Sequence, residues 1–160
     1  MIQKYKIVNN FLKGMKKSIF LFIIYFLLTE SIFALSSKYF DSGKKLFEKK
    51  KYEKSRILFE RDIVFNPKNE NSYLYLAKIF KINEDEISQE LNLNTVLLLN
   101  PKNDEAVYLL ALLKIKQSNY NEAKKLIENL ESVCKNFCLK IDEVKTQLAK
   151  LTPENGKNNN

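Results

Sequence analysis

The chain has 160 residues with no histidine, no tryptophan, two cysteines and three glycines, and its formal net charge is +8. Without histidine it cannot form a Ser-His-Asp or Cys-His catalytic site, and so few glycines disfavour a glycine-rich phosphate-binding loop. Two cysteines alone cannot complete a four-ligand zinc site. We therefore expect no enzyme, no metal and no cofactor. The length suits one domain, and the leucine- and lysine-rich composition favours an all-α fold.

Residues 1–34 have the layout of a secretory signal peptide. Five lysines, among them Lys16 and Lys17, precede ten unbroken apolar residues, Ile19 to Leu28, and the small residue Ala34 closes the segment. We expect cleavage between Ala34 and Leu35, with Met15 as a possible true start. The alternative is an uncleaved membrane anchor, although a spanning helix needs about 20 apolar residues and Glu30 interrupts the run. In either case we expect the rest of the chain to be exported, either free in the periplasm or anchored in the inner membrane.

The positive charge does not indicate a nucleic-acid-binding protein. The leader holds five lysines and one glutamate, and removing them leaves 22 basic and 18 acidic residues, a net charge of +4. Such a balance on lysine-rich helices is typical of a solvated surface. We therefore expect no nucleic acid among the partners.

One four-residue word occurs twice after the leader, as Asn66-Pro67-Lys68-Asn69 and Asn100-Pro101-Lys102-Asn103, with the prolines 34 residues apart. This period divides the chain into units 36–69, 70–103 and 104–137. A small residue recurs at one place in each unit: Gly43, Ala77 and Ala111. A small side chain there lets two helices approach closely. A predicted closing helix, 138–151, and a disordered tail, 152–160, complete the chain.

The period and these small residues resemble the tetratricopeptide repeat family over three units, 36 to about 134. The chain departs from the family pattern at Glu86, Gln89, Lys114 and Lys135. The resemblance implies a right-handed superhelical stack of helix–turn–helix units, whose first helices line a concave groove for peptides or partner helices. Ile141, Val144, Leu148 and Leu151 form an apolar stripe on the closing helix that such a stack needs at its end.

The resemblance also implies which side chains face the groove: Phe40, Lys44, Phe47, Leu74, Lys78, Lys81, Tyr108, Leu112 and Ile115. Family members that hold a chaperone's C-terminal carboxylate use basic and amide side chains at set groove places. Here those places carry Phe40, Lys44, Tyr75, Glu105 and Leu109, so that clamp is not carried over. Apolar groups surrounded by lysines favour an acidic amphipathic peptide or helix as the partner.

Cys134 and Cys138 lie at the junction where proline ended the earlier units. A disulfide there would fix the turn into the closing helix in an oxidising compartment, whereas two free thiols on one helical face are the alternative. We predict an exported, non-enzymatic interaction module for envelope protein assembly. A membrane-anchored accessory subunit is the alternative, and an enzyme or small-ligand binder is a further one.

Overall fold

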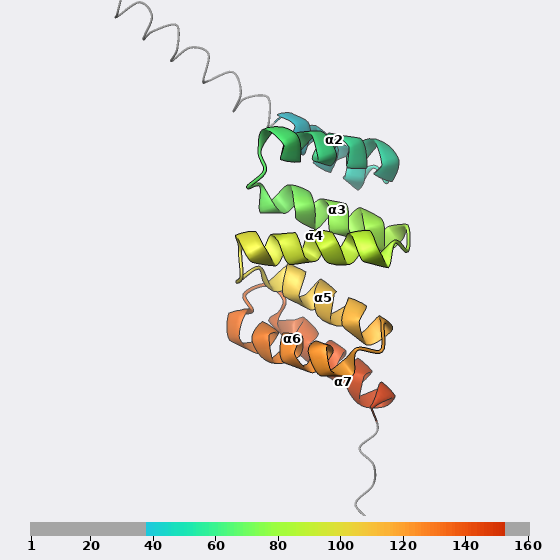
Figure 1. Ribbon diagram of the computed structural model, residues 1–160, viewed down its shortest axis with the longest axis vertical. Coiled ribbons are helices and arrows are strands. Elements are labelled where there is room, and N and C mark those ends of the chain that lie inside the picture. The colour runs from blue at the N-terminus through green and yellow to red at the C-terminus, as the bar shows by residue number, and fades with distance from the viewer. Residues whose placement is uncertain (1–37, 153–160) are drawn as a thin grey trace, which may run out of the picture.

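The computed structural model describes residues 38–152, and every regular element in this range is helical. The first described helix covers residues 38–48. The elements that follow are α2 (Tyr52–Phe65), α3 (Glu70–Ile82), α4 (Glu86–Leu99), α5 (Asp104–Lys116), α6 (Tyr120–Val133), a 3-10 turn (Cys138–Lys140) and α7 (Ile141–Leu151). Figure 1 shows them stacked in chain order along the long axis of the molecule.

The same backbone turn joins the two helices of each unit. Lys50, Glu84 and Ser118 follow each other at the 34-residue spacing and have φ angles of 57°, 58° and 58°. At the third turn the N–H of Ser118 donates to the carbonyl of Ile115 at 3.0 Å, and the N–H of Asn119 donates to that of Lys114 at 2.8 Å. The other two turns have the same pair of bonds, which is the Schellman arrangement. The sequence period is therefore also a period of the backbone.

Within the first unit, the two helices meet at Gly43. A β-carbon at this position would lie 2.9 Å from Cε1 of Phe59, and the Ser55 hydroxyl donates to the Gly43 carbonyl at 2.8 Å. Ala77 and Ala111 occupy the matching places in the next two units and are also buried. The small residues therefore lie at the closest approach of paired helices, where a longer side chain has no space.

Asparagine and carboxylate side chains close the turns between units. Asn66 and Asn100 end α2 and α4 with extended φ angles of −133° and −141°, as expected before proline. The Glu70 carboxylate at the start of α3 accepts from Asn100 and Asn103, which follow α4, at 2.9 and 3.4 Å. Asn103 also caps α5 by accepting the N–H of Ala106 at 3.0 Å.

The core has two parts. A smaller cluster is built on Phe59, Leu76 and Ile79, between the first unit and α3. A larger cluster runs from α3 to α7 and includes Val144, which is fully buried. Helix α7 thus covers the apolar end of the third unit through Ile141, Val144 and Leu148. Leu151, the last residue of the predicted stripe, is 49% exposed, and the predicted closing helix 138–151 begins as a 3-10 turn before α7.

One buried position interrupts the repeat pattern. Asp62 in α2 is fully buried, whereas Val96 and Leu130 stand at the matching places in α4 and α6. One carboxylate oxygen of Asp62 accepts from the Ser72 hydroxyl at 2.5 Å and from the Asn69 amide at 2.7 Å. The start of α3 therefore compensates the burial of this oxygen, whereas the other carboxylate oxygen of Asp62 is buried without a hydrogen-bond partner among the described residues.

The predicted leader, with its cleavage site at Ala34 and Leu35, and the tail beyond residue 152 lie outside the described residues. Between residues 38 and 152, no helix is both long and apolar enough to cross a membrane.

Candidate functional site

The first helices of successive units, 38–48, α3 and α5, form a continuous surface that we call the first-helix face. Side-chain contacts join it from one helix to the next. The ring of Tyr75 in α3 lies 5.9 Å from that of Phe40 and 5.1 Å from that of Phe47. The Lys78 ammonium then pairs with Glu105 in α5 at 2.7 Å, and the Tyr108 hydroxyl in α5 contacts Glu143 in α7 at 3.5 Å.

An aromatic cluster occupies this face between units one and two. Tyr75 stacks on Phe59 with a centroid distance of 5.0 Å and meets Phe40 and Phe47 edge-on. Phe40, Phe47 and Tyr75 are each half-buried, so part of every ring remains accessible. Burial raises the pKa of Tyr75, and the nearby carboxylates of Glu48 and Glu105 raise it further. The phenol therefore stays neutral at physiological pH.

The predicted lysines differ in how much of their charge is free. The Lys78 ammonium lies 4.9 Å from the centre of the Tyr75 ring and is paired with Glu105, so its charge is compensated within the chain. Lys44 and Lys81 are exposed, and neither has an ion pair among residues 38–152. Two of the three predicted lysines therefore remain available to an external carboxylate.

Three predicted groove residues are not accessible. Leu74, Tyr108 and Ile115 keep only 5%, 9% and 2% of their surface and belong to the core. Tyr108 packs against Phe137 at a ring distance of 5.3 Å, and burial raises its pKa, with Glu143 raising it further. The prediction that these three side chains contact a partner does not fit this structure, because all three belong to the core cluster that runs from α3 to α7. Tyr108 is covered where the polypeptide between α6 and α7 folds back onto α5. Leu112 is half-buried.

Sequence reasoning missed the central position of Tyr75 and Glu105. From the sequence, Tyr75 and Glu105 were noted only because they stand where other family members have the side chains that hold a C-terminal carboxylate. The available signal was the repeat register, since Asp41, Tyr75, Leu109 and Glu143 are equivalent positions on successive helices. That register aligns Tyr75 beside the predicted groove residue Leu74 but does not indicate which of the two is buried.

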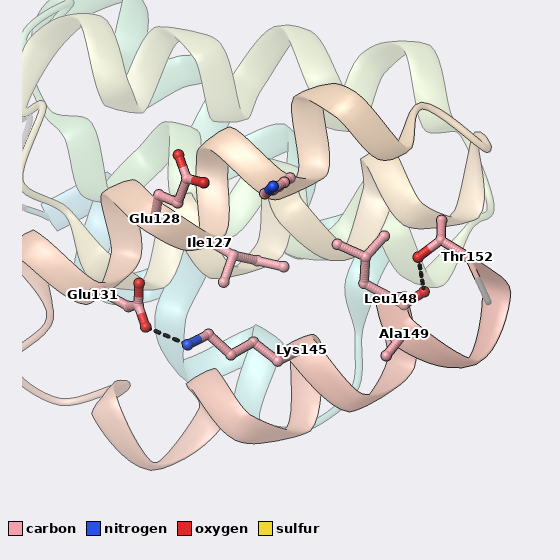
Figure 2. A pocket seen from close by; sticks show the side chains of 8 residues that line it. Ile127, Glu128, Glu131, Lys145, Leu148, Ala149 and Thr152 are labelled. Carbon is pink, nitrogen blue, oxygen red and sulfur yellow. Dashed lines mark hydrogen bonds and ion pairs between the residues drawn. The ribbon is translucent and has the colours of Figure 1, made fainter. Parts of the chain in front are cut away.

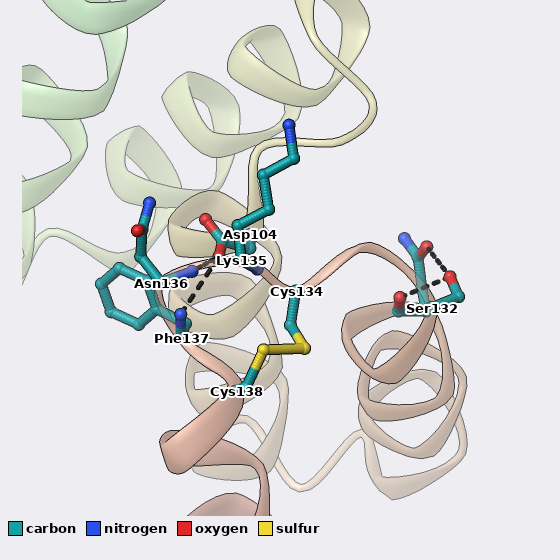
Figure 3. Close-up of a disulfide and its surroundings, with 8 residues drawn as sticks. Asp104, Ser132, Cys134, Lys135, Asn136, Phe137 and Cys138 are labelled. Carbon is teal, nitrogen blue, oxygen red and sulfur yellow. Dashed lines mark hydrogen bonds between the residues drawn. A yellow bond between two sulfur atoms is a disulfide. The ribbon is translucent and has the colours of Figure 1, made fainter.

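The loop before α7 contains the two cysteines (Figure 3). Cys134 and Cys138 form a disulfide, with Cα atoms 5.2 Å apart. One oxygen of Asp104, at the start of α5, accepts the backbone N–H groups of Lys135, Asn136 and Phe137 at 2.7, 2.6 and 3.1 Å. Burial alone would raise the pKa of Asp104, but these N–H groups hold it below its usual range. The loop is thus fixed both covalently and by a carboxylate.

An open cleft of about 730 Å³ lies between α6 and α7 (Figure 2). Ile127, Leu148 and Ala149 provide apolar walls, and an ion pair between Lys145 and Glu131 crosses one side. Lys145 stands at the place of the small residues Gly43, Ala77 and Ala111. A further helix could therefore not pack here as closely as α2 packs on Gly43. No group of three metal-ligating side chains occurs among residues 38–152.

No protein-family model matches this chain, and no curated protein matches it in sequence. Solved structures do resemble it. The TPR (tetratricopeptide repeat) domain of OM64 from Arabidopsis aligns with a TM-score of 0.69 and 17% identity, over 75% of this chain and 98% of that domain. The TPR2B domain of yeast Sti1, in a complex with pHsp70, gives 0.69 and 14%, over 74% and 98%.

The second TPR domain of human RPAP3, in complex with the HSP70 peptide SGPTIEEVD, aligns with a TM-score of 0.64 and 19% identity, over 76% of this chain and 98% of that domain. At such identities the likeness concerns the fold. The chain is an all-α stack of tetratricopeptide-type helix pairs closed by α7, and the predicted fold class is confirmed.

Proposed function

We propose that this chain is an exported, non-enzymatic protein-interaction module whose first-helix face binds a peptide or a helix of another protein. The observation that carries the proposal is the half-buried cluster of Phe40, Phe47 and Tyr75 on that face. Partly accessible aromatic rings are frequent anchor sites in protein interfaces. TPR domains of the same fold are found in complexes with peptides of other proteins, which supports this class of function.

The proposed partner is an acidic amphipathic segment. An apolar side chain of the partner would pack on the accessible edge of the aromatic cluster. Its carboxylates would approach Lys44 and Lys81, which are exposed on this face and have no ion pair among residues 38–152. Lys78 contributes less, because Glu105 already neutralises it. Exposed lysines mainly accelerate encounter and lose this effect as salt rises.

Photo-crosslinking in cells tests the surface. A photoreactive residue at position 44 should crosslink to a polypeptide, whereas the same residue at position 125, on the exposed side of α6, should not. A synthetic peptide of the captured segment should then bind the parent chain, and Lys44→Glu with Lys81→Glu should weaken it by about 10-fold at low salt. Equal crosslinking at both positions, or unchanged peptide affinity, would refute the site.

Envelope assembly in the periplasm is the setting that we propose, with an inner-membrane-anchored accessory subunit as the alternative. The proposal rests on residues 1–34 of the sequence. Mass spectrometry of the chain recovered from cells separates the two. A mature chain that begins at Leu35, and a block of this processing by Ala34→Arg, would support export with cleavage. An intact leader would support the anchor.

A further inference from the structure

The repeat register identifies one side of the first unit that has no helical neighbour among the described residues. In units two and three, one stripe of each first helix packs on the preceding unit. It consists of Ser72, Leu76 and Ile79 in α3, and of Ala106, Leu110 and Leu113 in α5, all buried. The matching residues of helix 38–48 are Lys38, Ser42 and Lys45, of which the lysines are exposed. Cations thus replace buried residues at the first end of the stack.

Further cations extend this surface. Lys49 continues the stripe of helix 38–48, and Lys54 and Arg61, seven residues apart, lie along α2; all three are exposed. We call Lys38, Lys45, Lys49, Lys54 and Arg61 the basic end face. On helix 38–48 it lies opposite Phe40 and Phe47, which contact α3. None of the five cations has an ion pair in the described part of the chain.

Four of the five acidic residues of the first unit are placed elsewhere, whereas Asp41 is exposed on helix 38–48 within one turn of Lys38 and Lys45. Glu53 accepts from Asn83 after α3, and Glu60 pairs with Arg56. Asp62 is bonded to the start of α3, and Glu48 lies near Tyr75. If the end of a repeat stack served only to prevent another repeat from packing on it, polar residues of either charge would be sufficient there. The opposite end of the molecule has both signs, with Lys140 paired to Glu143 and Lys145 paired to Glu131.

Apolar side chains adjoin the basic end face at the edge nearest residue 38. Phe65 stacks on Tyr39 at 5.7 Å and is 45% exposed, and Val64 beside it is 75% exposed. The apolar run that ends at Leu28 is separated from Lys38 by nine residues, which span about 30 Å at most. In the anchored alternative, in which the leader is retained, a bilayer that holds this run is therefore within reach of the basic end face.

We propose that the basic end face docks on an anionic phospholipid bilayer, with Phe65 inserted at the headgroup level. Each Lys or Arg near an anionic bilayer strengthens binding about five-fold, and the attraction weakens with salt. Phenylalanine beside lysine and arginine is typical of helices that lie at the boundary of headgroups and acyl chains. The partner surface is thus a lipid surface of negative charge, and the site lies on the side of unit one away from α3. This inference does not depend on what the first-helix face binds.

Because the chain has no tryptophan, Phe65→Trp supplies a single fluorescent reporter in the full chain as purified from cells. With vesicles of 30% phosphatidylglycerol in phosphatidylcholine, its emission should shift to the blue at low salt. The shift should be absent with pure phosphatidylcholine and should disappear in 0.5 M NaCl. Leu151→Trp, whose parent side chain is 49% exposed at the other end of the stack, is the matched control and should show no shift.

Charge variants in the Phe65→Trp background test the cations. Lys45→Gln, Lys54→Gln and Arg61→Gln together should lower the partition onto anionic vesicles about 100-fold. Lys124→Gln, Lys125→Gln and Lys150→Gln, also exposed, change the net charge equally and should leave it within about two-fold. Circular dichroism verifies that both variants are folded. An equal loss in both triple variants, an equal shift on neutral vesicles, or no shift at all would overturn the proposal.

Discussion

Gly43 and Phe59 are a matched pair: the β-carbon that alanine would add at position 43 lies 2.9 Å from Cε1 of the phenylalanine ring. The ring is fully buried and stacks on Tyr75, so it cannot move away freely. In the next two units the corresponding pairs are Ala77 with Leu93 and Ala111 with Ile127. In the first unit a large aromatic ring on the second helix therefore faces the one residue of the first helix that has no side chain.

This pairing predicts compensation. Gly43→Ala should destabilise the domain by about 1 kcal/mol, because overpacking costs about 1–3 kcal/mol and the helix propensity of alanine offsets part of it. Phe59→Leu alone should cost about 1–2 kcal/mol through the cavity that it leaves. The double variant imitates unit two and should be more stable than the sum predicts, by about 1 kcal/mol. Denaturant unfolding of the parent, both single variants and the double variant measures this coupling. Strictly additive changes in the free energy of unfolding would contradict the pairing of positions 43 and 59.

The left-handed residues of the turns predict a stabilising substitution. Ser118 has a φ angle of 58° and an exposed side chain. A non-glycine residue in this conformation costs roughly 1–2 kcal/mol, while glycine loses more entropy on folding. Ser118→Gly should therefore raise the free energy of unfolding by about 0.5–1 kcal/mol. Thermal unfolding detects this change, and Ser118→Val, which is strained at positive φ, should lower the melting temperature.

Asp104 predicts a pH-dependent contribution to stability. Its pKa is lowered in the folded state, so its stabilising effect is present above the pKa of the unfolded chain, which is about 4. The effect is lost as the pH falls through the lower folded pKa. Asp104→Ala should cost about 1–2 kcal/mol at pH 7, because three partly buried backbone N–H groups lose their acceptor. Urea unfolding of the two proteins at pH 7 and pH 3 should give a smaller difference at pH 3.

Lys114 and Glu90 form a second pair of residues for which we expect the changes in unfolding free energy not to add. It is buried, and its ammonium lies 2.5 Å from the Glu90 carboxylate and 3.5 Å from that of Glu122. Burial acts to lower the pKa of Lys114, but its bonds to Glu90 and Glu122 keep the pKa above its usual value. Lys114→Leu should cost about 1–3 kcal/mol, since Glu90 loses its partner. Lys114→Leu with Glu90→Leu should recover to within about 1 kcal/mol of the parent. A double variant as unstable as Lys114→Leu alone would contradict this coupling between Lys114 and Glu90.

The repeat architecture was predictable because it depends on local chemistry that recurs. Asn-Pro ends a helix wherever it stands, and a small residue marks close helix contact in every unit. These signals need no knowledge of distant residues. A spacing of 34 between Pro67 and Pro101 supported the resemblance that implies the helix pairs. The turn residues Lys50, Glu84 and Ser118 follow the same spacing.

What only the tertiary structure decided is which side chains of the first-helix face remain accessible. Leu74, Tyr108 and Ile115 were indistinguishable in sequence from exposed groove residues, because the helical period places them beside Tyr75, Leu109 and Lys116. Their burial depends on non-local packing, because all three belong to the core cluster that runs from α3 to α7. For Tyr108 alone, the loop from Cys134 to Cys138, held by Asp104, brings Phe137 onto the ring. Local sequence thus determined the helices and their order, whereas contacts between residues some 30 positions apart determined the surface.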